Sequence, residues 1–165
     1  MFEAHPADIS EDPYPDEDPV HYALRLAREK AEKVAAKFPG CFILGADTIV
    51  VVDKENLGKP RDARDAARML RLLSGRHHEV TTAVSVIAPE KPPEIRSQTT
   101  KVYFRELGED EIQQYIAEGE PMDKAGAYAI QGGAAPWVVR LEGDYSNVVG
   151  LPMPLVTQML RECGF

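Results

Sequence analysis

The stretch that most constrains the fold is an almost uninterrupted apolar run, CFILGADTIVVV, at residues 41–52. Its length suits a single strand buried on both faces, as is typical of parallel sheets. Gly45, Ala46, Asp47 and Thr48 interrupt the run. A carboxylate in such a strand is costly unless it is paired or used chemically, and small neighbours let a ligand approach closely. The run therefore indicates that Asp47 is the centre of a functional site. A carboxylate that caps a nearby turn or helix is the alternative.

Helices and strands are both expected along the rest of the chain. Apolar periodicity and turn residues predict helices at 19–38, 62–73, 109–118 and 153–163, and further strands at 79–87, 94–104 and 137–141. The strands at 79–87 and 94–104 are expected to pair antiparallel. Residues 1–19 are acidic and rich in proline, which predicts an extended segment or loop. We therefore expect one domain over residues 1–165, with an α/β fold built on a mixed sheet.

Composition excludes several classes of function. The net charge of −8 argues against non-specific nucleic-acid binding, although a local cluster of lysines can still bind a small anion. No apolar run approaches the roughly 20 residues that a transmembrane helix needs. The N-terminus lacks the features of a signal peptide, so a cytoplasmic protein is expected. Cys41, within the apolar run, and Cys163 are interpreted as reduced.

One lysine falls on the wrong face of its predicted helix. Ala23, Leu26, Ala27 and Val34 recur at helical spacing, and Lys30 lies in the middle of the stripe that they form. A lysine stem can carry its charge out to solvent. The position of Lys30 at the centre of the apolar stripe instead favours an internal anionic partner.

The other polar candidates each have an ordinary structural interpretation. Glu11 lies in an acidic segment where it could simply be solvated, and Lys59 lies in the tight corner Leu-Gly-Lys-Pro. Asp123 could cap a turn, and Gln131 could bond the turn backbone before Gly-Gly.

Two further pairs of residues are interpreted as structural. His77 and His78 are adjacent, so they point to opposite faces of a strand and do not form a metal-binding pair. Asp144 and Asn147 are expected to shape the turn before the last helix.

Five blocks of sequence, taken in order, resemble the Maf family of septum-formation-associated nucleoside triphosphate pyrophosphatases. The blocks are GADT at 45–48, GKP at 58–60, SGRHHEV at 74–80, DKAGAYAIQG at 123–132 and GDYSNVVGLP at 143–152. The likeness covers essentially the whole chain. It implies the fold of the inosine-triphosphate pyrophosphatases: a mixed, strongly bent sheet flanked by helices, with a cleft between two lobes. It further implies a homodimer that hydrolyses a nucleoside triphosphate to the monophosphate and pyrophosphate with a divalent metal, usually Mg²⁺, with Mn²⁺ as the alternative.

The resemblance also assigns roles to individual residues. Asp47 matches the family's proton acceptor, and Thr48 and Gln131 match positions linked to base choice, in the combination of the branch that acts on dTTP and UTP. The sister branch prefers 7-methyl-GTP. The residues that match the polar cleft are Glu11, Lys30, Lys59, Asp123 and Lys124. Of these, Lys30, Lys59 and Lys124 are expected to bind the phosphates. Glu11 and Asp47 are the candidates for holding the metal.

The chain departs from the family pattern at its N-terminus. Family members begin with a strand and a Ser-x-x-Arg loop, and the resemblance places Met1 after that segment; residues 1–19 contain no arginine or lysine. Three hypotheses follow. The protein is a nucleotide pyrophosphatase, a non-catalytic nucleotide-binding regulator of cell division and septum formation, or an inactive truncated form.

Overall fold

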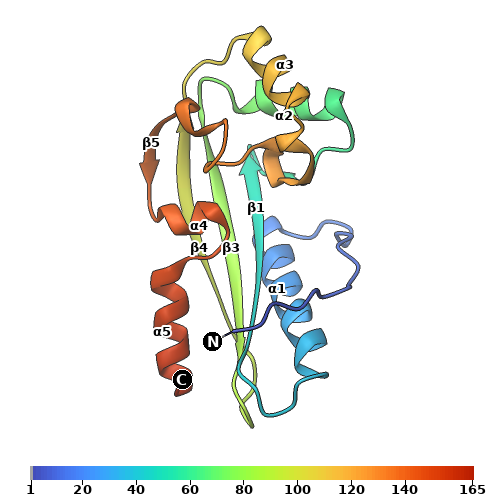
Figure 1. Ribbon diagram of the computed structural model, residues 1–165, viewed down its shortest axis with the longest axis vertical. Coiled ribbons are helices and arrows are strands. Elements are labelled where there is room, and N and C mark those ends of the chain that lie inside the picture. The colour runs from blue at the N-terminus through green and yellow to red at the C-terminus, as the bar shows by residue number, and fades with distance from the viewer. Residues whose placement is uncertain (1) are drawn as a thin grey trace.

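The computed structural model describes residues 2–165, which form a five-stranded sheet with helices on both faces (Figure 1). The strands are β1 (Ile43–Val52), β2 (Glu55–Leu57), β3 (His77–Ile87), β4 (Glu94–Phe104) and β5 (Val138–Glu142). The α-helices are α1 (Pro19–Ala35), α2 (Ala63–Leu73), α3 (Glu109–Ala117), α4 (Tyr145–Val149) and α5 (Met153–Cys163). Short 3₁₀ turns occupy Glu120–Asp123, Ala125–Ala127 and Ala135–Trp137. The predicted α/β class, a sheet flanked by helices, is confirmed.

The strand order is β2-β1-β3-β4-β5, and each described pairing is antiparallel. The apolar run at 41–52 is therefore not a parallel strand, and the expectation of a mixed sheet was wrong for residues 2–165. Cys41 precedes β1 and is exposed, and Leu44 is also exposed. The strand that is buried on both faces is β3, where every residue from Val80 to Val86 is buried. Large apolar residues alternate with small ones along β3, because the face against α1 carries small residues, such as Ala83, that allow the helix to pack closely.

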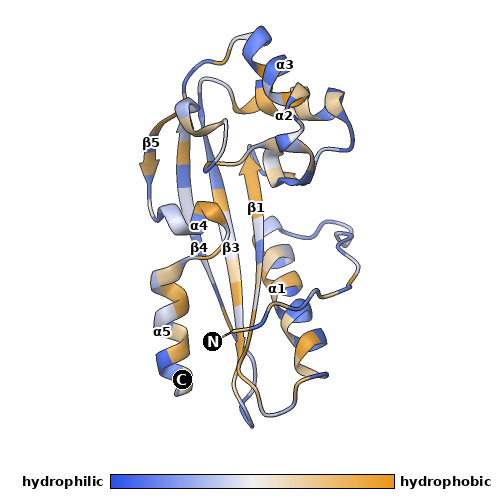
Figure 2. Cartoon of the chain, viewed as in Figure 1, coloured by the Kyte–Doolittle hydropathy of each residue, from blue (hydrophilic) through white to orange (hydrophobic). Residues whose placement is uncertain are grey.

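The two faces of the sheet are covered differently (Figures 1 and 2). Helix α1 packs on one face, where Ala23 and Ala27 contact Ile49 and Ala83. On the other face α5 packs against Val84 and its neighbours. The larger apolar cluster lies at the far end of that face, under α2, α3 and the segment between α3 and β5. No helix in residues 2–165 has both the length and the apolar character needed to cross a bilayer.

Local sequence explains where α1 and α2 begin. Asp18 accepts hydrogen bonds from the backbone N–H groups of Val20 and His21, and Asp62 accepts one from that of Asp65, so both are side-chain N-caps. The turn between β1 and β2 places Asp53 and Lys54 in the left-handed region, as a two-residue hairpin requires.

Helix α1 and strand β1 approach each other unusually closely at Gly45. A Cβ atom at this position would lie 2.5 Å from the carbonyl oxygen of Ala27 and 2.9 Å from the backbone nitrogen of Ala31. Both contacts are to helix backbone, which has no side-chain freedom with which to relieve them. The glycine therefore sets the distance between α1 and the sheet.

Candidate active site

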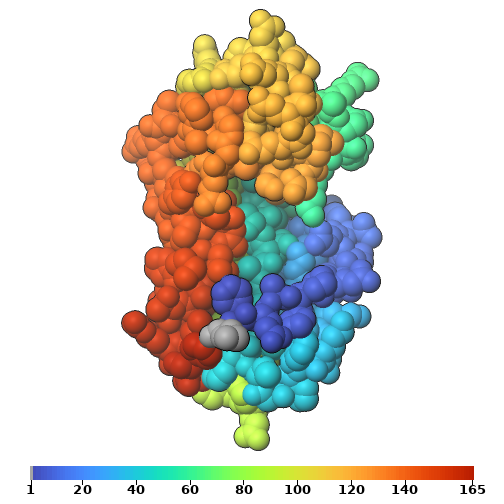
Figure 3. Space-filling model, viewed as in Figure 1, coloured from blue at the N-terminus to red at the C-terminus, as the bar shows by residue number. Residues whose placement is uncertain are grey.

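A cleft of about 850 Å³ lies along the open edge of β1. Within the described residues, β2 pairs only with Val50–Val52, so the part of β1 that contains Asp47 and Thr48 has no strand beside it on that side. In Figure 3 the teal residues of β1 form the floor of a hollow between the orange C-terminal part of the chain and the blue N-terminal segment. The open edge exposes the GADT block to a ligand.

The cleft brings together all the residues that the sequence singled out for it. Its lining includes Glu11, Lys30, Asp47, Thr48, Lys59, Asp123, Lys124 and Gln131. These residues come from five separate parts of the chain. Their convergence was predicted from the family resemblance and is confirmed as geometry; their roles stay predictions.

An ion-pair cluster centred on Lys30 forms the charged part of the cleft. Its Nζ lies 2.7 Å from Oδ1 of Asp47 and 2.8 Å from Oε1 of Glu11. The internal anionic partner predicted for Lys30 therefore exists. The side chains of Lys30 and Asp47 are 21% and 11% exposed, so water screens this pair less than a surface pair.

The environment shifts the pKa values of the three groups in different ways. Burial raises the pKa of Asp47 above its usual value, and the hydrogen bond from Lys30 opposes this shift only in part. The hydrogen bond from Lys30 lowers the pKa of Glu11, which is less buried. Burial acts to lower the pKa of Lys30, but its bonds to Asp47 and Glu11 outweigh burial and raise it. Lys30 is therefore charged at neutral pH, and the pKa values of the two carboxylates that pair with it are shifted in opposite directions.

Two more lysines lie at the rim of the cleft. Nζ of Lys59 is 3.9 Å from Oε2 of Glu11, and its side chain is largely exposed. Lys124 pairs with its neighbour Asp123 at 2.8 Å, and that carboxylate is exposed. Because the lysines are held only by weakly buried carboxylates, they can turn toward an anionic ligand at little cost.

Thr48 faces away from Lys30, because Asp47 points toward that lysine and successive residues of a strand point to opposite faces of the sheet. Its Oγ1 lies 2.9 Å from Oγ1 of Thr82. Thr82 in turn donates to the carbonyl of Asn147, whose amide bonds the backbone of Val80 and the hydroxyl of Thr100. Asn147 is fully buried. It holds the region around α4 against the sheet and, through Thr82, fixes the position of Thr48.

Gln131 is exposed, and the backbone of its loop is hydrogen-bonded on both sides of it. The hydroxyl of Tyr115 accepts from the N–H of Ala129, and the carboxylate of Glu120 accepts from that of Gly133. The small residues of this segment were expected to allow close backbone approach. Gly126 does so against Val50, where a Cβ would lie 2.9 Å from a methyl group.

Several lining residues were not predicted, among them Tyr22, Arg61, Tyr128 and Val149. Tyr128 lies within the predicted block DKAGAYAIQG, but nothing in the sequence separated it from a core aromatic. Its hydroxyl is 2.7 Å from Nε2 of His78. Burial lowers the pKa of His78 to about 3, so the histidine is neutral and structural, as predicted. Asp144 caps α4, again as predicted for that turn.

The carboxylates in the cleft fit a metal that is completed by its substrate. No group of three potential metal ligands occurs among residues 2–165. Mg²⁺, however, commonly takes one or two carboxylates and obtains its remaining ligands from water and substrate phosphates. Glu11 and Asp47 meet that minimal requirement, since both bind the same ammonium group.

The sheet, its covering helices and the cleft define an α/β protein with a charged cleft at an open sheet edge. The chain belongs to the Maf family, because the family model described as Maf-like protein matches residues 1–163.

Relatives named dTTP/UTP pyrophosphatase match nearly the whole chain. The protein from Koribacter versatilis is 52% identical over 164 residues, which are 99% of this chain and 84% of that protein. The protein from Citrifermentans bemidjiense is 52% identical over 165 residues, or 99% and 86% of the two chains. The protein from Syntrophomonas wolfei is 50% identical over 164 residues, or 99% and 87%.

Proposed function

We propose that the protein hydrolyses dTTP and UTP to the monophosphate and pyrophosphate, with Asp47 as general base. The observation that carries the proposal is the half-buried Asp47–Lys30 pair at the open edge of β1, within a cleft large enough for a nucleotide. The relatives that match 99% of the chain and are named for this activity support the choice of substrate. A homodimer, which the family resemblance implies, a cytoplasmic location and a single domain over residues 1–165 complete the proposal.

The roles of the residues follow from the charges that the reaction must manage. A water molecule attacks the α-phosphorus, its proton passes to Asp47, and pyrophosphate leaves. Lys30 engages Oδ1 of Asp47, which leaves Oδ2 to accept that proton. Lys30, Lys59 and Lys124 neutralise the phosphate oxygens as negative charge develops.

In this proposal Thr48 and Gln131 contact the base, because the family resemblance assigns them to base choice and both line the cleft. Glu11 and Asp47 would hold a divalent metal together with the substrate phosphates. Such a metal supplies Lewis-acid stabilisation of charge on the phosphoryl group.

Pyrophosphate release over a panel of nucleoside triphosphates tests this proposal. The panel contains dTTP, UTP, dCTP, ATP, GTP and 7-methyl-GTP, each assayed with Mg²⁺ and with a chelator. Faster release from dTTP and UTP than from the purine nucleotides is expected. Tight nucleotide binding with no product would instead favour the non-catalytic regulator, and neither binding nor turnover would favour the inactive form.

The pH dependence of kcat/KM is expected to report the ionisation of Asp47. A general base works only when it is deprotonated, so activity falls as the pH drops through its pKa. Because burial raises this pKa, the acid limb should lie above the value of about 4 that is ordinary for aspartate. In Lys30→Met the limb should move to still higher pH, since the lysine's bond lowers the pKa of Asp47. A limb that stays in place in that variant would assign it to another group.

A further inference from the structure

Glu11 reaches the active site from a segment without regular secondary structure. Residues 2–18 form neither helix nor strand, yet this segment brings the carboxylate of Glu11 to 2.8 Å from Lys30. A side chain on an untethered segment would spend little time in that position, because ordering each residue of a flexible chain costs entropy. Something in the folded protein must therefore hold the segment against α1.

Two side chains of α1 hold the backbone of this segment. The hydroxyl of Tyr22 donates to the carbonyl of Glu11 at 2.6 Å, and Nη2 of Arg25 donates to the carbonyl of Asp12 at 3.1 Å. Tyr22, Arg25 and Lys30 lie on the same helix. The helix that supplies Lys30 therefore also fixes the backbone position from which the Glu11 side chain extends.

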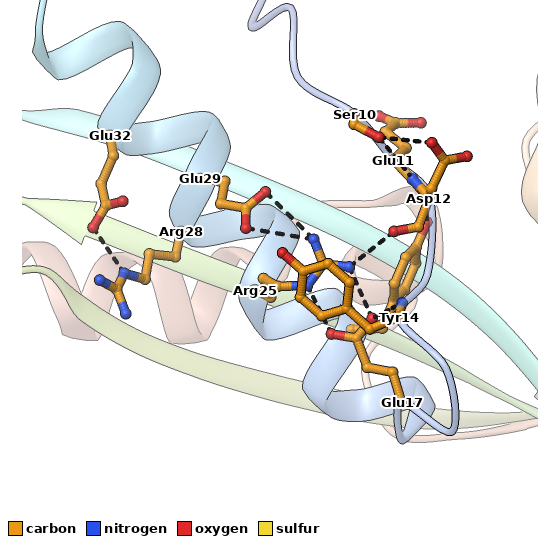
Figure 4. Close-up of polar contacts among 10 residues, drawn as sticks. Ser10, Glu11, Asp12, Tyr14, Glu17, Arg25, Arg28, Glu29 and Glu32 are labelled. Atoms are coloured by element: carbon orange, nitrogen blue, oxygen red, sulfur yellow. Dashed lines mark hydrogen bonds and ion pairs between the residues drawn. The ribbon is translucent and has the colours of Figure 1, made fainter.

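Arg25 is the centre of these contacts (Figure 4). It forms a two-point ion pair with Glu17, with Nε–Oε1 and Nη2–Oε2 distances of 2.7 and 2.8 Å. Its guanidinium lies 4.0 Å from the centre of the Tyr14 ring. The side chains of Arg25 and Glu17 are only 17% and 10% exposed. Glu17 also accepts from the backbone N–H of Tyr14 at 3.0 Å, so the turn at 14–17 is closed around the arginine.

Arg25 itself is separate from the ligand site. The described residues that line the cleft include Glu11, Asp12, Pro13 and Tyr22, but not Arg25. A planar guanidinium that binds a carboxylate at two points and stacks on a ring cannot be matched by lysine. These contacts have no use in binding a nucleotide directly. Their geometry fits one purpose, which is to fix the segment that carries Glu11.

We propose that Arg25 is a positioning residue for the reaction: its clamp on residues 12–17 places the Glu11 carboxylate beside Lys30. This proposal rests on the proposed pyrophosphatase function. Removing a residue that orients a functional group without touching the substrate typically lowers activity by about 10- to 100-fold. Arg25→Met, which keeps much of the stem but loses the charge, should therefore lower kcat/KM by that amount. Arg25→Lys should restore only part of the loss.

The chain offers a matched control one turn further along the helix. Arg28 pairs with Glu32 on the same helix, and both are well exposed. Figure 4 shows this pair apart from the clamp. Arg28→Met removes the same charge and a similar ion pair without touching residues 11–17. It should leave kcat/KM unchanged within about twofold, as surface pairs contribute little.

A double-mutant cycle with Glu11 separates positioning from general destabilisation. Arg25→Met, Glu11→Gln and the double variant are compared for kcat/KM on dTTP and for amide hydrogen exchange of Tyr14 and Glu17. If Arg25 acts through Glu11, the double variant should lose little more activity than Glu11→Gln alone. Exchange at both amides should be faster in Arg25→Met and unchanged in Arg28→Met.

Either of two results would overturn the proposal. Losses that multiply fully in the double variant would mean that Arg25 acts independently of Glu11. Unchanged exchange at Tyr14 and Glu17 in Arg25→Met would mean that the arginine does not hold the segment, and this arm can be read without any turnover. If the unmodified protein releases no pyrophosphate from any nucleotide, the proposed function fails, and the exchange result still decides whether the clamp exists.

Discussion

Replacing Asp47 with asparagine is expected to lower kcat on dTTP by about 10²- to 10⁴-fold, the usual contribution of a general base. The amide has nearly the same size, but it cannot take a proton from water at the operating pH. Lys30 keeps Glu11 as a partner, so its charge is not left unpaired. The folded structure should therefore survive, and the loss should appear in pyrophosphate release and not in the melting temperature.

Asp53→Asn provides the control for this substitution. Asp53 lies just beyond the end of β1, pairs with Arg76 on the surface and has a positive φ that asparagine tolerates. The same chemical change outside the cleft should leave kcat unaffected. Full turnover in Asp47→Asn would remove Asp47 from the role of base, whatever happens to the control.

Replacing Gly45 with alanine is expected to have the largest effect on stability. The added methyl group would meet the backbone of α1 at 2.5 Å, so the helix must move away from the sheet. Overpacking of this kind costs about 1–3 kcal/mol, and we expect the upper part of that range, because the opposing atoms are backbone. Urea unfolding at equilibrium measures the change. Activity should fall as well, since Lys30 would be carried away from Asp47 with its helix.

Gly58→Ala is the matched control for stability. A Cβ at Gly58 would find no atom within 4 Å, so the free energy of unfolding should change by no more than about 0.5 kcal/mol. If Gly45→Ala were as stable as this control, the expected clash between a Cβ at Gly45 and the backbone of α1 would be contradicted.

Much of the fold could be predicted from the sequence because the signals were local. Strand β4 and helix α5 begin and end where apolar periodicity and turn residues placed them, and Asp62 caps α2 as expected. Helix α4 was missed and interpreted as a turn. It has only five residues and is held mainly by the buried Asn147, which is a long-range contact that local pattern does not encode.

The pairing direction of the strand at 41–52 was wrongly predicted as parallel for a related reason. A continuous apolar run predicts a strand covered on both faces, and parallel pairing is the commonest cause of that pattern. In this protein β1 is antiparallel, and its apolar residues serve different surroundings: Ile49 contacts α1, whereas Val50 joins the larger cluster under α2. Only the three-dimensional arrangement distinguishes the two cases.

The site was predicted in part from residues and in part from the family resemblance. The position of Lys30 in an apolar stripe indicated an internal anionic partner, and Asp47 and Glu11 are the carboxylates that pair with it. The convergence of Lys59, Lys124 and Gln131 on the same cleft came from the resemblance alone. The contacts by which Tyr22 and Arg25 hold residues 11–17 were not predicted, because an arginine on a helix has no distinguishing pattern in sequence.

The close packing of α1 on the sheet restricts which substitutions the protein can accept during evolution. In the described part of the chain, α1 is the helix that covers the sheet face carrying Ala83. Its residues Ala23, Ala27 and Ala31 lie in this contact and are essentially unexposed. A larger side chain at any of them would lift the helix and lengthen the Lys30–Asp47 distance. These alanines carry no charge and touch no ligand. They should nevertheless tolerate as little sequence drift as the residues that do the chemistry.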